Sequence, residues 1–307
     1  MDLKKSIKRT GYSIGEPFIK LCSLIINNMS LRAAYGLASG VGCLFYLFSG
    51  KHRSVAYEGL MQAFDGEKAQ KEIRKIAEDC FVFIAKSATE LMLFRDKPVL
   101  LRKSVDIEGK WVIDKALSEG KGVILVSAHL GNFPLILARL SLEGYNTAVI
   151  MRPLKMKAAR EVFESQSAKL NIEAIYSIPR KACVEGAIRS LRKNRLLFIP
   201  LDQNFGTAGV YVDFFGRKAA TATGPIVLAQ RTGALIVPCF VIRQKGDTHK
   251  IIFEQPLKLQ TRATEEETIQ FNVQKITDVI ESYIRKYPAQ WSWIHRRWKS
   301  RPKQGGE

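Results

Sequence analysis

The sequence lacks the short motifs that identify nucleotide-binding and metal-binding sites. It contains no Walker-type loop and no G-x-G-x-x-G fingerprint, the two glycine-rich patterns that cradle phosphate groups. Its four histidines include no pair with the spacing of metal ligands. Nothing in the sequence therefore favours a nucleotide cofactor or a catalytic metal, and we expect neither.

The sequence is also poor in cysteine, and its cysteines form no pattern. The five residues are scattered without a C-x-x-C pair, so neither a zinc site nor a disulfide framework is indicated. This distribution fits a reducing compartment. The cysteines are Cys22, Cys43, Cys80, Cys183 and Cys239.

Acidic residues are few for a chain of this size. The 307 residues contain 29 Asp and Glu against 48 Lys and Arg, which gives a formal net charge of +19. Such an excess indicates an anionic partner, either nucleic acid, an anionic membrane surface or an acidic protein, unless it only forms a soluble basic surface. The hydrophobic share of 46% is enough for a sizeable core.

Two apolar stretches lie near the N-terminus, at Phe18–Ile26 and Ala33–Ser49. The first is too short to span a bilayer, and the second is uncharged and close to the lower limit for a span. Basic residues flank both ends of this region, which favours a helix-turn-helix in the cytoplasmic leaflet, or a single anchor, over a buried core helix. We therefore divide the chain into membrane-associating helices at residues 1–50 and a second domain at 51–307.

From Val105 onward, short apolar runs alternate with amphipathic stretches, a pattern typical of an α/β sheet with helical crossovers. Residues 67–95, before this region, have the periodicity of one long amphipathic helix. Strands are expected at Val123–Val126, Thr147–Met151, Leu196–Leu201, Leu235–Phe240 and Ile251–Phe253, and helices near residues 135–143, 156–169 and 181–193, after Thr223-Gly224-Pro225, and after the capping box Thr264–Glu267.

A histidine follows the apolar run Val123–Val126. After His129, Gly131 and Asn132 favour a tight turn, and Pro134 suits the first turn of a helix. Ligands bind at this edge of open α/β sheets. A lone histidine beside an apolar run is more often structural than catalytic, so this stretch alone does not establish a function.

An acidic residue follows a second apolar run in the same way. Asp202 and Gln203 come after the strand expected at Leu196–Leu201, which places Asp202 and His129 at one edge of the sheet. A carboxylate beside a histidine fixes the tautomer of the ring and stabilises the imidazolium, which suits a general base. The alternative for Asp202 is a turn or helix-capping aspartate.

Three further residues are suited to binding an anion. Thr223 and Gly224 stand at an expected helix start, where free backbone N–H groups attract negative charge. Arg152 follows the strand Thr147–Met151 and suits a phosphate or a carboxylate, unless it is an exposed loop arginine.

The segment Gln290–Lys299 interleaves aromatic with basic residues. This composition suits nucleic acid or an interface with lipid head groups, and it is equally consistent with packing of the C-terminal segment onto the core. The segment also contains His295, the main alternative to His129 as a catalytic histidine.

Taken together, these blocks resemble the lipid A biosynthesis acyltransferases of the lauroyl and myristoyl type, within the lysophospholipid acyltransferase superfamily. The resemblance extends over about residues 50–300. The matching blocks are Glu108-Gly-Lys, Gly120-Lys-Gly-Val-Ile-Leu, Ala128-His129-Leu-Gly-Asn-Phe, Met151-Arg152-Pro153, Asp202-Gln203, Phe214-Phe-Gly, Ala222-Thr-Gly-Pro225, Ala229-Gln-Arg-Thr-Gly233 and Gln290-Trp-x-Trp-x-His295-Arg-Arg-Trp-Lys.

The resemblance implies a central mixed sheet flanked by helices, with an N-terminal hydrophobic anchor and an acyltransferase domain at residues 51–307. It implies an enzyme at the cytoplasmic face of the cell inner membrane. This enzyme would move a fatty acyl chain from acyl carrier protein or acyl-CoA to a hydroxyl of a lipid A precursor or a related glycolipid or lysolipid. It implies no cofactor beyond that co-substrate, and no nucleic acid partner.

Roles for individual residues also follow from the resemblance. His129 would act as general base with Asp202 as its partner. Substrate would be bound by Gly131, Asn132, Arg152, Gln203, Thr223 and Gly224, with the backbone near Gly131 and Asn132, or Arg152, meeting the oxyanion.

The sequence departs from the family at one position. The family signature is a histidine, four residues, and then Asp or Glu, and here Pro134 stands at the acidic position. Either Asp202 supports His129 in an active enzyme, or the chain is a weakened or non-catalytic relative that binds lipid. A basic nucleic-acid-binding protein is the alternative from a different class.

Overall fold

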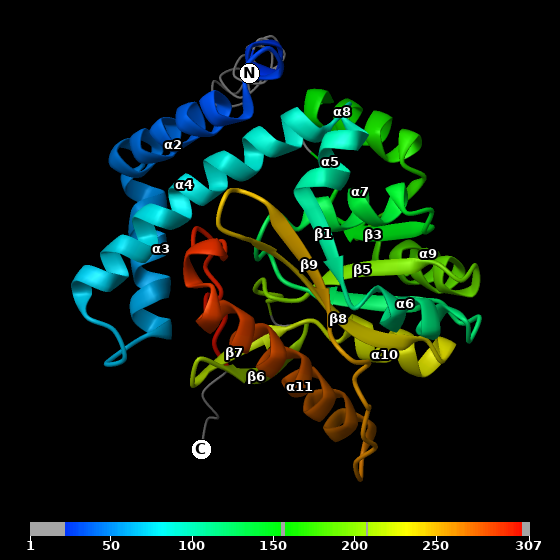
Figure 1. The fold of residues 1–307 in the computed structure, drawn as a ribbon. Helices are drawn as coiled ribbons and strands as arrows, with labels where there is room; N and C mark the ends of the chain where they lie inside the picture. Colours follow the sequence, from blue (N-terminus) through cyan, green and yellow to red (C-terminus); the bar gives the residue numbers. More distant parts are fainter. Residues whose placement is uncertain (1–21, 155–156, 207, 303–307) are drawn as a thin grey trace, which may run out of the picture.

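The structure, a computed structural model, describes residues 22–154, 157–206 and 208–302. A seven-stranded sheet lies at its centre in the order β1-β9-β8-β2-β5-β3-β4 (Figure 1). Its strands are β1 (Val105–Glu108), β2 (Val123–Ser127), β3 (Thr147–Met151), β4 (Ile172–Tyr176), β5 (Leu196–Pro200), β8 (Leu235–Arg243) and β9 (His249–Phe253). β8 and β9 pair antiparallel and all other neighbours pair parallel, so the predicted mixed α/β sheet is confirmed.

Alternate residues of β2 belong to different halves of the core. Ile124 and Val126 pack with the helices at Arg180–Arg192, Gly224–Thr232 and Glu265–Lys286 on one face, and Val123 and Leu125 pack with those at Pro98–Ser104, Lys110–Leu117 and Pro134–Leu142 on the other. Because both faces are covered, β2 is apolar throughout, as parallel strands usually are. The helices are α2 (Leu31–Phe48), α3 (Gly50–Ala63), α4 (Gln70–Phe94), α5 (Pro98–Ser104), α6 (Lys110–Leu117), α7 (Pro134–Leu142), α8 (Lys157–Lys169), α9 (Arg180–Arg192), α10 (Gly224–Thr232) and α11 (Glu265–Lys286).

All five strands predicted from apolar runs are present, with bounds that differ by three residues or fewer at each end. The capping box before α11 is also confirmed, since the side chains and backbone N–H groups of Thr264 and Glu267 bond reciprocally. The prediction omitted β1, β4 and the hairpin of β6 (Val210–Phe214) and β7 (Arg217–Thr221). β7 has a sequence of low strand propensity, and its conformation depends on pairing with β6.

Helix α2 leaves several large apolar side chains exposed. The side that packs on α4 holds small residues along most of its length and Tyr46 near its end, and an added Cβ at Gly42 would lie 2.5 Å from the Cα of Val82. On the other side, Leu44 and Phe48 are 54% and 84% exposed. Within the described residues, α2 alone is long and apolar enough to cross a membrane, and only 22% of it is buried, which is unlike a core helix.

The predicted boundary at residue 50 falls where α2 meets α3. The apolar stretch predicted at Phe18–Ile26 lies partly outside the described residues, and its described part, from Cys22, is helical. The division into two domains stays a prediction, and α2 is held against α4 rather than standing apart from the rest (Figure 1).

Candidate active site

His129 and Asp202 meet at the carboxyl edge of the sheet. His129 follows β2 and Asp202 follows β5, which is the parallel neighbour of β2. The His129 Nδ1–H donates to Asp202 Oδ1 over 2.8 Å, and the backbone N–H of His129 donates to Asp202 Oδ2, also over 2.8 Å. The predicted contact between these two residues is therefore confirmed. Because Nδ1 is engaged, the ring presents Nε2 as its remaining nitrogen.

The two side chains differ in their access to solvent. The carboxyl group of Asp202 is 2% exposed and the ring of His129 is 23% exposed, so the histidine forms the open side of the pair. Burial alone would lower the pKa of His129, but the charge and hydrogen bond of Asp202 raise it above its ordinary value. Burial would raise the pKa of Asp202, and the charge and hydrogen bonds of His129, with the indole of Trp291, hold it below its usual range.

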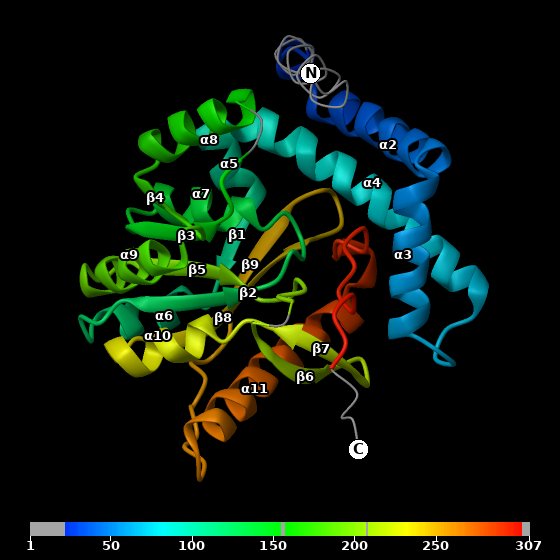
Figure 2. The ribbon, with the colours of Figure 1, turned by 180° about the vertical axis from the view of Figure 1, so that it is seen from behind.

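The C-terminal segment completes the surroundings of this pair. The Trp291 Nε1–H donates to Asp202 Oδ2 over 2.7 Å, so the carboxylate accepts three hydrogen bonds in all. The backbone of the same segment runs antiparallel to the histidine turn, with Gly131 N donating to Gln290 O and Ser292 N donating to His129 O. Figure 2 shows this segment in red between the sheet and α3.

The tryptophans of this segment belong to the core or pack against it. Trp291 and Trp293 are 2% and 0% exposed, and Arg297 is 1% exposed. Of the three interpretations of Gln290–Lys299, the structure therefore supports packing onto the core. No local sequence pattern identifies Trp291 as a partner of Asp202, because the two residues are 89 positions apart in the chain.

One of the backbone donors expected in the turn after His129 already has a partner within the protein. The N–H of Gly131 is already bonded to Gln290, and an added Cβ at Gly131 would lie 1.6 Å from the carbonyl oxygen of Val241. Asn132 is 2% exposed, and its amide donates to the carbonyl of Ser87 and to Glu90 Oε2. These two donors therefore bond within the protein and hold the turn in place. A role of either residue in substrate binding stays a prediction.

The other predicted substrate-binding residues lie around this edge but form no hydrogen bond to His129 within the described residues. Arg152 is exposed at the end of β3. Gln203 has an exposed side chain directly after Asp202. Thr223 is half-buried and Gly224 exposed where α10 begins, and the Thr223 side chain does not cap that helix.

His295 lies close to the pair, although it does not replace His129 in it. Its Nε2 accepts the backbone N–H of Asn204 over 3.1 Å, which places the ring proton on Nδ1. Burial lowers the pKa of His295, and the nearby positive charges of His129, Arg297 and Arg152 lower it further, against the opposing charge of Asp202. A neutral imidazole is therefore expected here.

Arg297 is buried below the Asp202 loop and forms no direct ion pair with the residues that the structure describes. Its guanidinium donates to the carbonyls of Gln203 and Ala220 and to the hydroxyl of Thr221. Burial lowers the pKa of Arg297 to about 10, while the charge of Asp202 opposes that shift. The arginine thereby joins the loop after β5 to the β6–β7 hairpin.

Pro134 opens α7 as its first residue, as the sequence predicted. Phe133, just before it, stands edge-on to the ring of His129 with 4.7 Å between the ring centroids. The acidic position of the family signature is thus a helix-start proline, and the carboxylate that contacts His129 belongs to Asp202.

The described residues form no metal-binding cluster. In the described part of the chain, no group of three or more acidic, histidine or cysteine side chains could hold a metal ion, and all five cysteines are free. The chemistry that the site supports is proton transfer at Nε2 of His129, with Asp202 holding the opposite nitrogen.

The chain is similar in sequence to several known bacterial proteins. The sequence profile of the bacterial lipid A biosynthesis acyltransferases matches residues 5–300 of the chain. The lipid A biosynthesis palmitoleoyltransferase of Escherichia coli is 25% identical over 274 residues, 87% of this chain and 85% of that protein. The lipid A biosynthesis lauroyltransferase of Escherichia coli is 25% identical over 273 residues, 87% of this chain and 86% of that protein.

More distant similarities extend the comparison. A phosphatidylinositol mannoside acyltransferase of Mycolicibacterium smegmatis is 24% identical over 195 residues, 63% of this chain and 61% of that protein. The crystal structure of a 1-acyl-sn-glycerophosphate acyltransferase from Thermotoga maritima aligns over 87% of this chain and 97% of that one, with 17% identity and a TM-score of 0.38.

Proposed function

Because the chain belongs to the bacterial lipid A biosynthesis acyltransferase family and is an acyltransferase, we propose that it transfers a fatty acyl chain to a hydroxyl of a lipid A precursor or a related glycolipid. The observation that carries this proposal is the His129–Asp202 pair at the carboxyl edge of the sheet, with Nε2 left for the substrate. The acyl donor is a thioester, of acyl carrier protein or of coenzyme A.

The proposed reaction needs only one proton carrier. Nε2 of His129 takes the proton of the acceptor hydroxyl as its oxygen attacks the thioester carbonyl. The tetrahedral intermediate then collapses, the C–S bond breaks, and the imidazolium returns the proton to the leaving thiolate. The products are an ester and a free thiol, and no acyl group passes through the enzyme.

The proposed role of Asp202 is to hold the imidazole of His129 in one tautomer and to stabilise its protonated form. By accepting Nδ1–H, it keeps the proton off Nε2, and its charge stabilises the imidazolium that forms during the attack. Trp291 holds the carboxylate from the other side. This arrangement supplies the acid that Pro134 does not, which is why we propose an active enzyme and not a lipid-binding relative without activity.

Acyl carrier protein is the donor that the charge of the chain favours, because it is acidic and the net charge here is +19. For the acceptor, the names of the relatives point to glycolipids, lipid A precursors in Escherichia coli and a phosphatidylinositol mannoside in a mycobacterium. We propose that Arg152, exposed at the same sheet edge, meets an anionic group of the acceptor. We also propose that the acceptor contacts Gln203, Thr223 and Gly224 as it reaches His129.

We further propose that the enzyme binds the cytoplasmic face of the inner membrane through α2. One face of this helix packs against α4, and the opposite face exposes large apolar residues such as Leu44, Leu47 and Phe48. An exposed apolar face of this kind indicates a membrane or partner interface. The positive charge favours an anionic lipid surface.

A reconstituted transfer assay tests the proposed function. Purified protein in vesicles containing anionic lipid is incubated with a lipid A precursor and either acyl-ACP or acyl-CoA, and the products are identified by mass spectrometry. We expect acyl-ACP to yield a product heavier by one acyl chain. Lipid binding without product from either donor would favour the non-catalytic relative, and recovery in the soluble fraction with co-purifying nucleic acid would favour a nucleic-acid-binding protein.

A further inference from the structure

A buried carboxylate contacts the histidine turn through Asn132. Glu90, on α4, is 0% exposed, and its two oxygens accept hydrogen bonds from four other elements or loops. Arg243 at the end of β8 donates to both oxygens, over 2.7 and 2.9 Å. Tyr35 of α2 and His249 of β9 each donate to Oε1 over 2.9 Å, and Asn132 donates to Oε2 over 2.8 Å.

Asn132 connects this carboxylate to the site. It lies three residues after His129 in the same turn, and its amide also donates to the carbonyl of Ser87 over 3.1 Å, one helical turn before Glu90. These two bonds fix both the position and the orientation of the amide. Gly131, in the same turn, packs directly against the carbonyl of Val241 in β8, so the turn cannot shift toward that strand.

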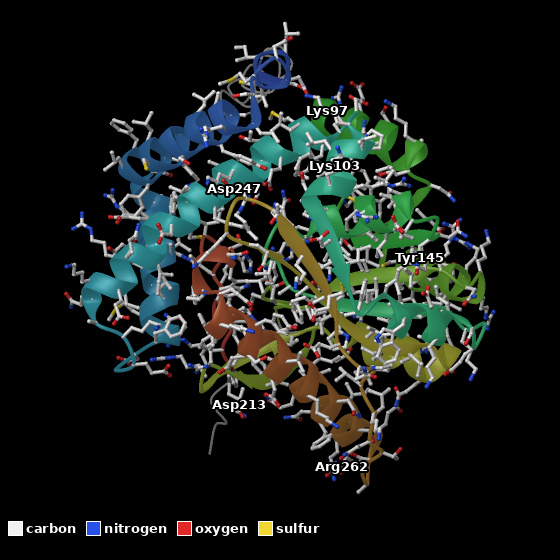
Figure 3. The ribbon with its side chains drawn as sticks, viewed as in Figure 1. Lys97, Lys103, Tyr145, Asp213, Asp247 and Arg262 are labelled. Atoms are coloured by element: carbon white, nitrogen blue, oxygen red, sulfur yellow. The ribbon has the colours of Figure 1, made fainter. Side chains whose placement is uncertain are left out.

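Arg243 joins both supports of the turn. Its side chain holds Glu90, and its backbone forms a reciprocal pair with the side chain of Gln290, whose own carbonyl accepts the N–H of Gly131. Asp247, labelled in Figure 3 at the β8–β9 loop beside α4, bonds to Arg243 and to Lys86 at the rim of this cluster. The turn is thus held between α4 and β8 by buried polar bonds.

We infer that Glu90 is a positioning residue, which sets the place of His129 through Asn132. Stability alone does not explain this cluster, since buried ion pairs contribute little more than apolar packing of the same volume. What the cluster provides is geometry, because Glu90 accepts bonds from four separate parts of the chain and Asn132 is bonded to α4 at both Ser87 and Glu90. Burial opposes the ionisation of Glu90, but the bonds and charges of His249, Arg243 and Asn132 hold its pKa below its usual range.

This inference rests on the proposed function, and its test uses two variants and a matched control. Asn132→Ala removes the link to the turn and leaves the Glu90–Arg243 pair intact. Glu90→Gln keeps the shape and removes the charge. The control is Asn272→Ala on α11, an amide 1% exposed that donates to the carbonyls of Gln260 and Thr268 and contacts no part of the turn.

We expect Asn132→Ala to lower kcat about tenfold or more, the scale of a small misplacement of a catalytic group, with little change in the KM for the acceptor. The acid limb of the pH–rate profile moves to lower pH, because a loosened contact with Asp202 raises the pKa of His129 less. Asn272→Ala destabilises the fold to a similar degree and leaves both kcat and the acid limb unchanged. The double variant of Glu90 and Asn132 is no slower than the slower single variant.

The inference would be overturned if folded Asn132→Ala and Glu90→Gln proteins both had the kcat and the acid limb of the wild type. It would also be overturned if the two losses of kcat multiplied in the double variant. If Glu90→Gln does not fold, Asn132→Ala decides. If the wild type has no transferase activity, the proposed function fails, and hydrogen exchange at residues 129–133 decides the inference separately: faster exchange in Asn132→Ala than in Asn272→Ala supports it, and equal exchange refutes it.

Discussion

Replacing Asp202 by asparagine removes one charge and leaves the shape of the site unchanged. In the native protein one carboxyl oxygen faces the Nδ1–H of His129, and the other faces two donors, His129 N–H and Trp291 Nε1–H. The asparagine amide must direct its NH₂ group toward one of these positions. An NH₂ group that faces two N–H donors loses two hydrogen bonds, and one that faces Nδ1 loses at most one. We therefore expect the NH₂ group to face Nδ1.

That orientation disables the base. Nδ1 must then accept a hydrogen bond, so the ring proton moves to Nε2, the atom that would take the proton of the acceptor. General-base support is worth about 10²–10⁴-fold in rate, and we expect kcat to fall by about 10³-fold, equal to about 4 kcal/mol in the barrier. Residual activity shifts its acid limb to lower pH, because the charge of Asp202 raises the pKa of His129 and burial alone lowers it.

The assay is transfer from acyl-ACP to a lipid A precursor in vesicles, followed over a range of pH for wild type and Asp202→Asn. Thermal unfolding of both proteins shows that the variant is folded. A variant whose rate and acid limb both match those of the wild type would refute the assignment of Asp202 as the partner of His129.

The remaining predictions concern residues around the pair and on α2. Trp291→Phe keeps the ring packing and removes the N–H that holds Asp202. A hydrogen bond to a charged group is worth about 1.5–3 kcal/mol, so kcat in the same assay should fall at least about tenfold, and an unchanged kcat would show that the indole is only packing. Pro134→Glu should leave kcat near that of the wild type, because Asp202 already occupies Nδ1 and the α7 N-terminus accommodates an acid; a large rise would identify a weakened relative. Leu44→Asp with Phe48→Asp should move the protein from the membrane to the soluble fraction at an unchanged melting temperature, and retention in the membrane would contradict the proposed role of α2.

The sequence was sufficient for those features that depend on local patterns. The apolar run at Val123–Val126 predicted β2, and the same pattern before Asp202 predicted β5, so the meeting of His129 and Asp202 followed from two strand ends in a parallel sheet. The mixed sheet itself was implied by the resemblance. These features need no knowledge of long-range packing beyond the fold class.

Contacts between distant parts of the chain were not predictable in this way. Gly131 looked like a source of backbone donors, but its N–H bonds to Gln290, 159 positions later in the chain. The periodicity of residues 67–95 predicted an amphipathic helix, but in α4 the apolar Leu91 is 42% exposed and the acidic Glu90 is fully buried. An acidic residue on a buried helix face indicates a polar cluster, but its partners come from α2, β8 and β9, and only the fold identifies them.

The proposal that His129 is the general base is tested most directly by one comparison. Transfer from acyl-ACP to a lipid A precursor is measured for wild type and His129→Ala in the same vesicles, at equal amounts of folded protein, with the acylated product quantified by mass spectrometry. We predict that the wild type forms the product and that His129→Ala forms none above background. Full activity of His129→Ala would contradict the mechanism.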